Sequence, residues 1–365
     1  MPPLRVTAAH ARRFLRRALL LDAPAPDVAT ALAHHGYIQI DPINVCGRMH
    51  DLILRNRVTG YREGDLHTHL HSPARPGFEH YLPTAGILVA YPAEAWACLV
   101  PLLHARRLRR SPAYRRKLSP KHEQLAQHIL GEITARGPLT SDDIEHEGRS
   151  VTGWGSPGRL VKNLLEVLFV HGRVLITARR SFRRVYDLPE RVLPRSLLDA
   201  PPKSAAEIAR WTALLRLRQR RLVILKRDEL PLIEDLVQPV AIAGLPPLHC
   251  LREDVPLFAQ IGNQESKIEN SPLLLAPLDP LIYDRRLTSV LWNFHYTWEV
   301  YTPEHKRQRG YYALPILAGT EIVGHVDPKA DRPARRLRVM ARFVRRGHRV
   351  APAVAELARF LGLRR

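Results

Sequence analysis

Residues 157–188, PGRLVKNLLEVLFVHGRVLITARRSFRRVYDL, decide the fold of this chain. Apolar residues recur at helical spacing over 157–170, with a proline at the start and Gly172 just past the end, which are the positions these residues favour at helix termini. Two stretches rich in β-branched and apolar residues, 173–178 and 184–188, follow with an arginine-rich link between them. This region therefore predicts a helix followed by a basic β-hairpin.

Two further helices are predicted before this region. Residues 121–135 have helical periodicity, and in residues 137–144, GPLTSDDI, a hydroxyl or a carboxylate can cap a short second helix. Three helices followed by a basic hairpin are typical of winged helices, in which one helix enters a DNA groove and the wing contacts phosphate. Winged helices also serve as protein-interaction modules, so the pattern alone leaves that alternative open.

The N-terminal part of the chain is also predicted to be mainly helical. Residues 7–35 predict two helices, with Asp27 as the N-cap of the second and Gly36 at its end. Helical spacing returns over residues 43–55 and again over 93–114.

The C-terminal part repeats the winged-helix pattern more weakly and then becomes rich in strands. Residues 204–256 predict an arginine-rich helix, an apolar helix and two strands, and short strands follow from residue 271 up to a terminal helix at 352–361. We predict an α+β fold of tandem winged helix-turn-helix units with a C-terminal β-rich segment. The predicted segments are a winged-helix-like unit at 1–118, a second winged helix at 119–195, and a third winged-helix-like unit with the β-rich segment and terminal helix at 196–365.

Composition and charge favour nucleic acid over a membrane as the partner. The 365 residues carry 56 Lys and Arg against 35 Asp and Glu, a formal net charge of +21, which favours a polyanionic partner such as nucleic acid. The apolar runs are far shorter than the ~20 residues of a membrane-spanning helix, so an anionic membrane is the weaker choice. With no convincing signal peptide, we expect a monomer in the cytoplasm, associated with the nucleoid. The three cysteines have no CxxC spacing, which supports neither a zinc ribbon nor a disulfide scaffold.

The most informative stretch for chemistry is GYIQIDPINV, residues 36–45. Pro42 disfavours the helical region for Asp41, so Gln39 and Asp41 are expected on one face of an extended segment, roughly 7 Å apart. An acceptor and an amide at this separation can hold one water molecule between them, as a hydrolytic centre requires. The alternative is an edge strand whose Asp41 caps the helix that follows.

Motifs in two distant blocks resemble one known family. YIQIDPINV, with RMHDLIL and Arg57 after it, resembles the catalytic segment of the winged-helix DNA glycosylases that repair interstrand crosslinks, the AlkZ and YcaQ family. The resemblance recurs more than 200 residues later, in PLDPLI (277–282), WEVY (298–301), RGYYALP (309–315) and VDPKADR (326–332).

The resemblance implies a chemistry for the first block. The family signature is Gln, an apolar residue, then Gln or Asp, and Gln39-Ile40-Asp41 is similar to the Asp branch, which is associated with broader tolerance of N7-alkylated purines and their crosslinks. Because an N7-alkylated purine is already cationic, it leaves without protonation, and a single carboxylate can suffice. Asp41 would then act as general base or stabilise the oxocarbenium charge, while Gln39 orients the water.

Further expectations follow from a water nucleophile. The enzyme would be monofunctional and would leave an abasic site for downstream enzymes, because a lyase needs a lysine in the pocket and residues 1–116 contain none. Neither a metal nor an organic cofactor is expected. The expected pocket residues are Tyr37, Asn44 and His50.

Duplex binding is assigned to arginines in three clusters, namely Arg12, Arg13, Arg16 and Arg17; Arg106, Arg107, Arg109 and Arg110; and Arg179, Arg180, Arg183 and Arg184.

Two other functions remain open at this point. A non-catalytic winged-helix transcriptional regulator would read bases from the start of a recognition helix, where Arg159 and Asn163 stand. A metal-dependent nuclease could use the histidine run, His67, His69 and His71, if that segment were extended.

Overall fold

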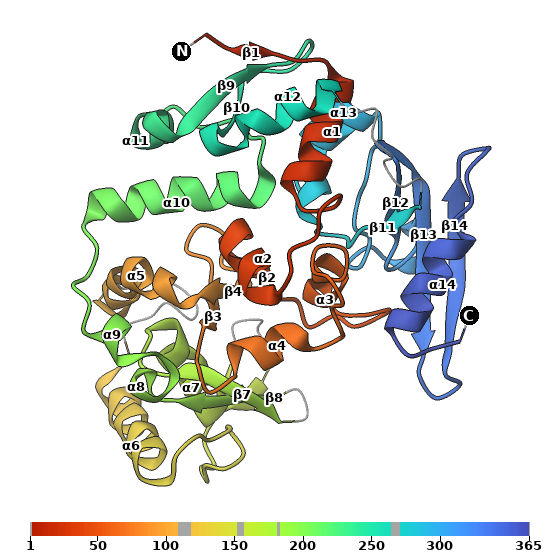
Figure 1. Ribbon diagram of the computed structural model, residues 1–365. Coiled ribbons are helices and arrows are strands. Elements are labelled where there is room, and N and C mark those ends of the chain that lie inside the picture. Colours follow the sequence, from red (N-terminus) through yellow and green to blue (C-terminus); the bar gives the residue numbers. More distant parts are fainter. Residues whose placement is uncertain (1, 109–117, 152–156, 181–182, 264–270, 365) are drawn as a thin grey trace. The chain divides into compact units, whose positions relative to one another are not determined.

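The computed structural model describes residues 2–108, 118–151, 157–180, 183–263 and 271–364, and Figure 1 shows their helices and strands. The chain forms two compact units. Unit 1 consists of Met1–Gly36, Ile40–Asp65 and Thr212–Arg365, and unit 2 of Tyr37–Gln39 and Leu66–Trp211. Unit 2 is therefore inserted into the chain of unit 1. Of the segments predicted from sequence, 119–195 lies within unit 2, whereas 1–118 is divided between the two units.

Unit 2 contains a three-stranded antiparallel sheet that includes the short strand on which Gln39 lies. Its order is β2 (Ile38–Gln39), β4 (Leu88–Pro92) and β3 (Gly77–Tyr81). Gln39 lies opposite Val89 on β4. Helix α4 (Asp65–Leu70) precedes the sheet, and η1 (Ala93–Ala95) with α5 (Trp96–Leu108) follows it.

The predicted helix and basic hairpin of unit 2 are confirmed. Helix α6 (Pro120–Arg136) begins at the N-cap Ser119, and α7 (Leu160–Val170) packs against it. The buried residues of α7 include Val161, Leu164, Leu165 and Leu168, the spacing of one apolar helix face. Strands β7 (Leu175–Arg180) and β8 (Arg183–Asp187) form the hairpin.

Two details of this region were predicted wrongly. Residues 139–144 form a turn instead of a short helix, because Asp143 accepts hydrogen bonds from the Thr140 N–H (2.7 Å) and hydroxyl (2.9 Å), a local pattern that competes with helix. Residues Pro157–Arg159 form strand β6, paired with β5 (Arg149–Val151), so α7 starts three residues later than predicted. Helices α8 (Pro189–Val192), α9 (Arg195–Leu198) and α10 (Ala205–Arg220) follow the hairpin.

The two N-terminal helices of unit 1 are confirmed, and their caps explain them. Helix α1 (Ala8–Ala18) has Thr7 as N-cap. Helix α2 (Val28–His35) begins at Asp27, whose carboxylate accepts the Thr30 N–H at 2.7 Å, and ends at Gly36. Gly36 has φ +74°, and a Cβ there would lie 3.0 Å from the Leu215 side chain, so glycine meets both the conformation and the close approach.

The predicted helix at 43–55 is shorter than expected. Helix α3 covers only Met49–Leu54. The Asn44 side chain accepts the Gly47 N–H at 3.1 Å, and Gly47 has φ +117°, so a turn occupies the first half of the predicted helix.

The arginine-rich helix, apolar helix and two strands predicted over 204–256 are also confirmed. After α10 come α11 (Leu230–Ile233), η3 (Glu234–Leu236), β9 (Val237–Ala241), β10 (Leu248–Leu251), η4 (Arg252–Asp254) and α12 (Val255–Asn263). Strand β1 (Leu4–Arg5) adds to β9 in parallel. Helix α1 packs against α12 and α13 (Arg285–Trp292) beside this sheet.

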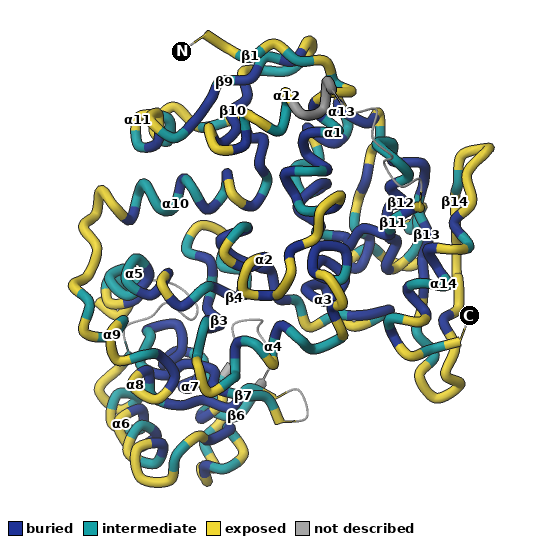
Figure 2. Tube along the Cα trace, viewed as in Figure 1, coloured by how far each residue is buried: buried dark blue, intermediate teal, exposed yellow. Residues whose placement is uncertain are grey.

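The C-terminal β-rich segment and terminal helix are confirmed as well. Strands β11 (Leu273–Leu274), β12 (Leu314–Ala318), β13 (Glu321–Asp331) and β14 (Arg336–Val344) form an antiparallel sheet in this order. Helix α14 (Ala351–Phe360) lies against the sheet (Figure 1), and its apolar face shares one core with α3, β12 and β13. Strand β14 is the exposed edge in Figure 2. Between β11 and β12 run η5 (Pro280–Ile282), α13 and η6 (Glu304–Lys306).

The fold is thus α+β with several small sheets. In the described part of the chain, no helix combines the length and apolarity that crossing a membrane requires.

Candidate active site

Gln39 is held by regular structure. It ends strand β2, pairs with Val89, and is only 6% exposed. The strand stops there, so Asp41 lies in an irregular segment that belongs to unit 1.

Asp41 is a half-buried carboxylate whose environment makes it more basic than usual. Burial raises the pKa of Asp41 above its ordinary value, and the Ile43 N–H, which donates to its Oδ1 at 2.9 Å, offsets part of the rise. Helix α3 begins eight residues later at Met49, with Arg48 as its N-cap. Asp41 therefore does not cap that helix, so this half of the structural alternative is wrong, whereas its other half, an edge strand, is confirmed because β2 lies at the edge of its sheet.

The three expected pocket residues have different surroundings. Tyr37 is buried. The pKa of Tyr91 is raised mainly by the burial of Tyr91 and, to a smaller extent, by Tyr37. Asn44 is exposed. His50 is fully buried on α3, with its Nε2 3.6 Å from a carboxylate oxygen of Asp51. Of the three, only Asn44 lies at the surface of the described structure.

A buried ion pair joins the two sequence blocks within unit 1. Arg57 and Asp279 are both fully buried, and the guanidinium donates two parallel bonds to the carboxylate, at 2.9 and 2.6 Å. Arg57 also donates to the Ile53 carbonyl at 3.0 Å, and Asp279 accepts the Leu281 N–H at 3.0 Å. The bidentate pair therefore ties the segment after α3 to η5, and both partners also bond to backbone groups, which supports a charge pair in the core.

A comparison with known families covers both sequence blocks. A family model for AlkZ-like DNA glycosylases matches residues 32–362, a span that contains both sequence blocks. The chain belongs to this family of DNA glycosylases. The solved structure of the DNA glycosylase AlkZ of Streptomyces sahachiroi is similar in fold to this glycosylase, with a TM-score of 0.64 and 14% identity over 99% of this chain and 98% of that one. DNA is accordingly the substrate, as the net charge and the motifs indicated.

The α1 arginines of the glycosylase divide into two groups. Arg12 makes an ion pair with Glu321. Arg16 is buried and donates to Asp22 and, at 2.5 Å, to the Gly319 carbonyl. These two guanidinium groups thus have protein partners inside unit 1, and the remaining two residues of this cluster, Arg13 and Arg17, are half-buried.

The second arginine cluster is described in part. Arg106 and Arg107 occupy the last turn of α5, whereas Arg109 and Arg110 lie outside the described residues.

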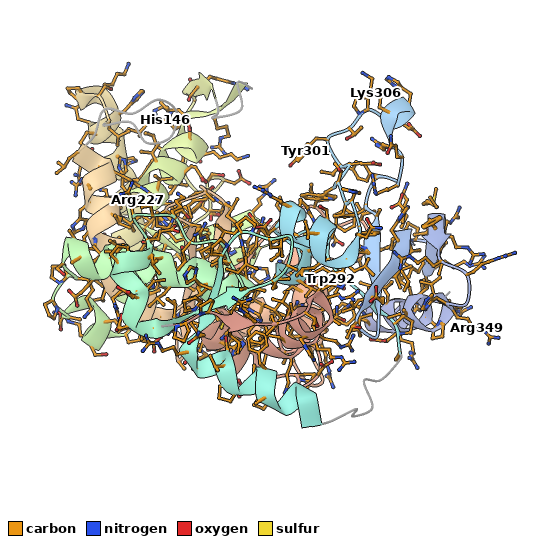
Figure 3. The ribbon with its side chains drawn as sticks, turned by 90° about the horizontal axis from the view of Figure 1, so that it is seen from above. His146, Arg227, Trp292, Tyr301, Lys306 and Arg349 are labelled. Carbon is orange, nitrogen blue, oxygen red and sulfur yellow. The ribbon has the colours of Figure 1, made fainter. Side chains whose placement is uncertain are left out.

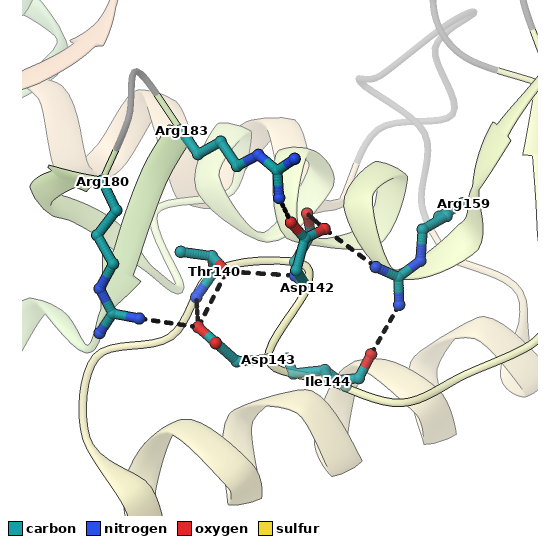
Figure 4. A network of polar contacts seen from close by, with 8 residues as sticks. Thr140, Asp142, Asp143, Ile144, Arg159, Arg180 and Arg183 are labelled. Carbon is teal, nitrogen blue, oxygen red and sulfur yellow. Dashed lines mark hydrogen bonds and ion pairs between the residues drawn. The ribbon is translucent and has the colours of Figure 1, made fainter.

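The hairpin arginines of the glycosylase have carboxylate neighbours that the sequence analysis did not anticipate. Figure 4 shows Arg180 contacting Asp143 (3.4 Å) and Arg183 contacting Asp142. Both side chains remain largely exposed, at 61% and 65%. Arg159 approaches Asp142 from the other side at 3.1 Å. The 139–144 turn therefore ties the hairpin to the start of α7 while leaving two arginines at the surface.

The other two hairpin arginines are bound inside unit 2. Arg179 donates to the buried Glu79, and Arg184 donates to Glu166 at 2.6 Å. Their charges are largely compensated by these carboxylates.

His67 and His69 lie on helix α4 and His71 directly follows it, so the run does not have the extended conformation assumed for the metal-site alternative. The Nε2 atoms of His67 on α4 and of His71 just after it lie 3.8 and 3.3 Å from Glu79 Oε1, and Arg179 contacts the second oxygen. Burial alone would raise the pKa of Glu79, but His71, Arg179 and His67 together hold it well below its ordinary value. Glu79 is therefore an anion that pairs with Arg179 and lies beside two imidazoles, and its contacts join the α4 region, β3 and the hairpin.

Sequence reasoning missed Asp279 and Tyr312 as parts of this region. Both lie in the second motif block, but only the structure places Asp279 against Arg57 and Tyr312 in the core with Cys46. The PLDPLI and RGYYALP motifs were the available signal, because they contain Asp279 and Tyr312, but a motif does not show which residue each side chain contacts.

Proposed function

We propose that this glycosylase hydrolyses the N-glycosidic bond of N7-alkylated purines in duplex DNA, including interstrand crosslinks. The observation that carries the proposal is Asp41, a half-buried carboxylate with a raised pKa two residues after the end of strand β2. A more basic carboxylate accepts a proton more readily, and a cationic purine needs no acid at the leaving group.

The proposed reaction uses one water molecule and two side chains. Water attacks C1′ while the bond from C1′ to N9 breaks, and the bonding electrons neutralise the cationic purine. Asp41 takes the proton of the water or stabilises the positive charge on the sugar, and the Gln39 amide orients the water. The products are a free base and an abasic site with an intact strand, which other enzymes then process.

The surrounding residues are proposed to have unequal roles. Asn44 is exposed and can reach DNA directly. Tyr37 and His50 are buried, so we assign them to supporting the motif segment rather than to contacting the base.

We further propose that DNA is bound by winged-helix units in segments 1–118, 119–195 and 196–365. In the second, α6, α7 and the β7–β8 hairpin would form the module, with the hairpin as the wing. Arg159 is occupied by Asp142 and Asn163 donates to Ser150 at 2.6 Å, which supports backbone binding over reading of base sequence. Phosphate contacts are assigned to the arginine clusters, chiefly to Arg180 and Arg183. We propose a monomer that works on nucleoid DNA in the cytoplasm.

The double variant Arg180→Ala/Arg183→Ala tests the wing assignment. Removing one phosphate-binding arginine should flatten the dependence of log affinity on log salt by about 0.9, so the slope should change by about two units at most, equally for all sequences. The measurement is a salt titration of binding to two undamaged duplexes of unrelated sequence.

A matched control uses an arginine of the same unit. Arg195 is 80% exposed and paired with Asp199, and its replacement by alanine should leave the slope unchanged. An unchanged slope in the double variant would show that the hairpin does not contact phosphate.

Excision of 7-methylguanine tests the function itself. Purified protein should release this base from methylated duplex DNA at the same rate with and without a chelator, and the strand should break only after later treatment with alkali. Strand breakage without alkali would indicate a lyase, loss of activity with chelator would indicate a metal enzyme, and binding without release would contradict the proposed substrate.

A further inference from the structure

The loop that precedes β12 in unit 1 presents aromatic side chains to solvent. Tyr301 is 83% exposed, the largest value among the exposed aromatic residues of the described chain. Figure 3 shows Tyr301 and Lys306 on this loop, which projects from the rest of unit 1. Tyr311, in the same loop, is 37% exposed, and exposed apolar side chains gathered on one segment are a mark of interaction sites.

The loop is held in place by two carboxylates. Glu299 accepts the backbone N–H groups of Gln308 (2.9 Å) and Arg309 (2.8 Å) and also pairs with the Arg309 guanidinium. Asp327 accepts the N–H groups of Tyr311 (3.0 Å) and Tyr312 (2.9 Å).

A glycine is required where these two anchors meet. Gly310 has φ +120°, and a Cβ there would come within 2.1 Å of an Asp327 oxygen. The loop is therefore ordered before any ligand binds, so little conformational entropy is lost on binding.

A row of aromatic rings runs inward from Tyr301. The ring centroids of Tyr301 and Trp298 lie 6.1 Å apart, and those of Trp298 and the fully buried Tyr312 lie 5.9 Å apart. Trp298 and Ile43 both pack against the core that contains Tyr312. The pKa of Tyr312 is raised first by burial, then by Cys46 and then by the charge of Asp41. The inner end of the row is thus close to the segment that carries Asp41.

The loop also carries positive charge. Lys306 is exposed, and the Arg307 guanidinium lies over the Tyr311 ring, 4.8 Å from its centroid, while its Nε donates to the Thr302 carbonyl. Glu304 is the acidic residue of η6. Exposed aromatic rings beside cations are the combination that binds unstacked nucleobases and their phosphates.

We propose that Tyr301, supported by Trp298, stacks against a nucleobase that becomes exposed when the duplex opens at the lesion, while Lys306 and Arg307 neutralise the adjacent phosphates. The inference rests on the proposed role of Asp41 only for the position of the lesion. Stacking does not require excision, so it can be tested without it.

The test compares binding to two duplexes of one sequence, one intact and one with a tetrahydrofuran abasic analogue that leaves a base unpaired. Wild-type protein should prefer the abasic duplex. Tyr301→Ala should reduce that preference by about tenfold, within the range for removal of one aromatic stacking partner, whereas Tyr301→Phe should retain it within about threefold. Phe343→Ala, at an aromatic residue of the same unit that is 60% exposed on β14, is the matched control and should change nothing.

Each other outcome overturns the proposal. A wild-type protein without preference, or a Tyr301→Ala variant that keeps it, would remove the stacking role. Equal weakening on both duplexes would indicate a general backbone contact instead. Since the experiment measures binding, its results would stay the same even if Asp41 proved not to be catalytic.

Discussion

Asp41→Asn is expected to slow release of 7-methylguanine from duplex DNA by roughly 10²-fold or more, the scale of a positioned acid–base group. The amide keeps the shape of the side chain but cannot accept the proton or stabilise positive charge at C1′. DNA affinity should stay nearly the same, because one half-buried carboxylate contributes little to phosphate binding. Single-turnover excision and equilibrium binding, measured on the same duplex, give the two numbers.

Two variants of neighbouring residues serve as controls. Gln39→Ala should lose less activity than Asp41→Asn, because orientation of the water is only part of the barrier. Wild-type activity in Asp41→Asn would remove Asp41 from the mechanism. A wild-type Gln39→Ala together with an inactive His50→Ala would mean that the catalytic centre lies elsewhere.

The raised pKa of Asp41 gives the same assignment a signature in pH. Asp41 must be ionised to act as a base, so excision should be constant well above its pKa and fall as pH is lowered through it. Because burial raises that pKa, the fall should begin at a higher pH than for an ordinary aspartate. The residual activity of Asp41→Asn should lack this limb of the profile.

Asp279→Ala is expected to lower the free energy of unfolding of unit 1 by about 3 to 5 kcal/mol, the usual cost of removing one partner of a buried ion pair. The cause is the fully buried Arg57 guanidinium, which would keep its charge and lose its bidentate partner. Urea denaturation followed by circular dichroism measures the change.

The control for this variant lies a few residues further along the chain. Asp284 caps α13 by accepting the Leu287 N–H, and its replacement by alanine should cost only about 1 kcal/mol. The double variant Arg57→Met/Asp279→Leu removes both charges and should recover part of the stability lost in Asp279→Ala. Equal stability of Asp279→Ala and Asp284→Ala would contradict the importance of the pair.

Features set by local chemistry were predictable from sequence. The ends of α2 follow from Asp27 and Gly36, and the basic hairpin follows from strand propensity on both sides of an arginine-rich link. The candidate pair Gln39 and Asp41 rests on a motif only a few residues long and stays a prediction.

Features set by distant partners were not predictable. Arg179 was predicted to contact DNA, and its carboxylate partner Glu79, which is 100 residues away in the chain, could not be identified from the neighbouring sequence. The same holds for the pairing of Arg57 with Asp279, which spans 222 residues. Short turns failed for a different reason: at Thr140 and Asp143, side-chain hydrogen bonds to the backbone outweighed a weak helical tendency.

The insertion of unit 2 into unit 1 has a consequence for synthesis on the ribosome. Helix α1 packs against α12 and α13, and Leu4 of β1 pairs with Val240, so α1 and β1 lack these partners until unit 2 has been made. At about 5 to 20 residues per second, the 146 residues of Leu66–Trp211 take roughly 7 to 30 s to translate. During that interval the apolar face of α1, with Phe14 and Leu15, has no core to enter. Nascent chains stalled at a length that exposes residue 211 outside the ribosome, but not α12, should therefore hold a folded unit 2 and a protease-sensitive N-terminus that chaperones bind.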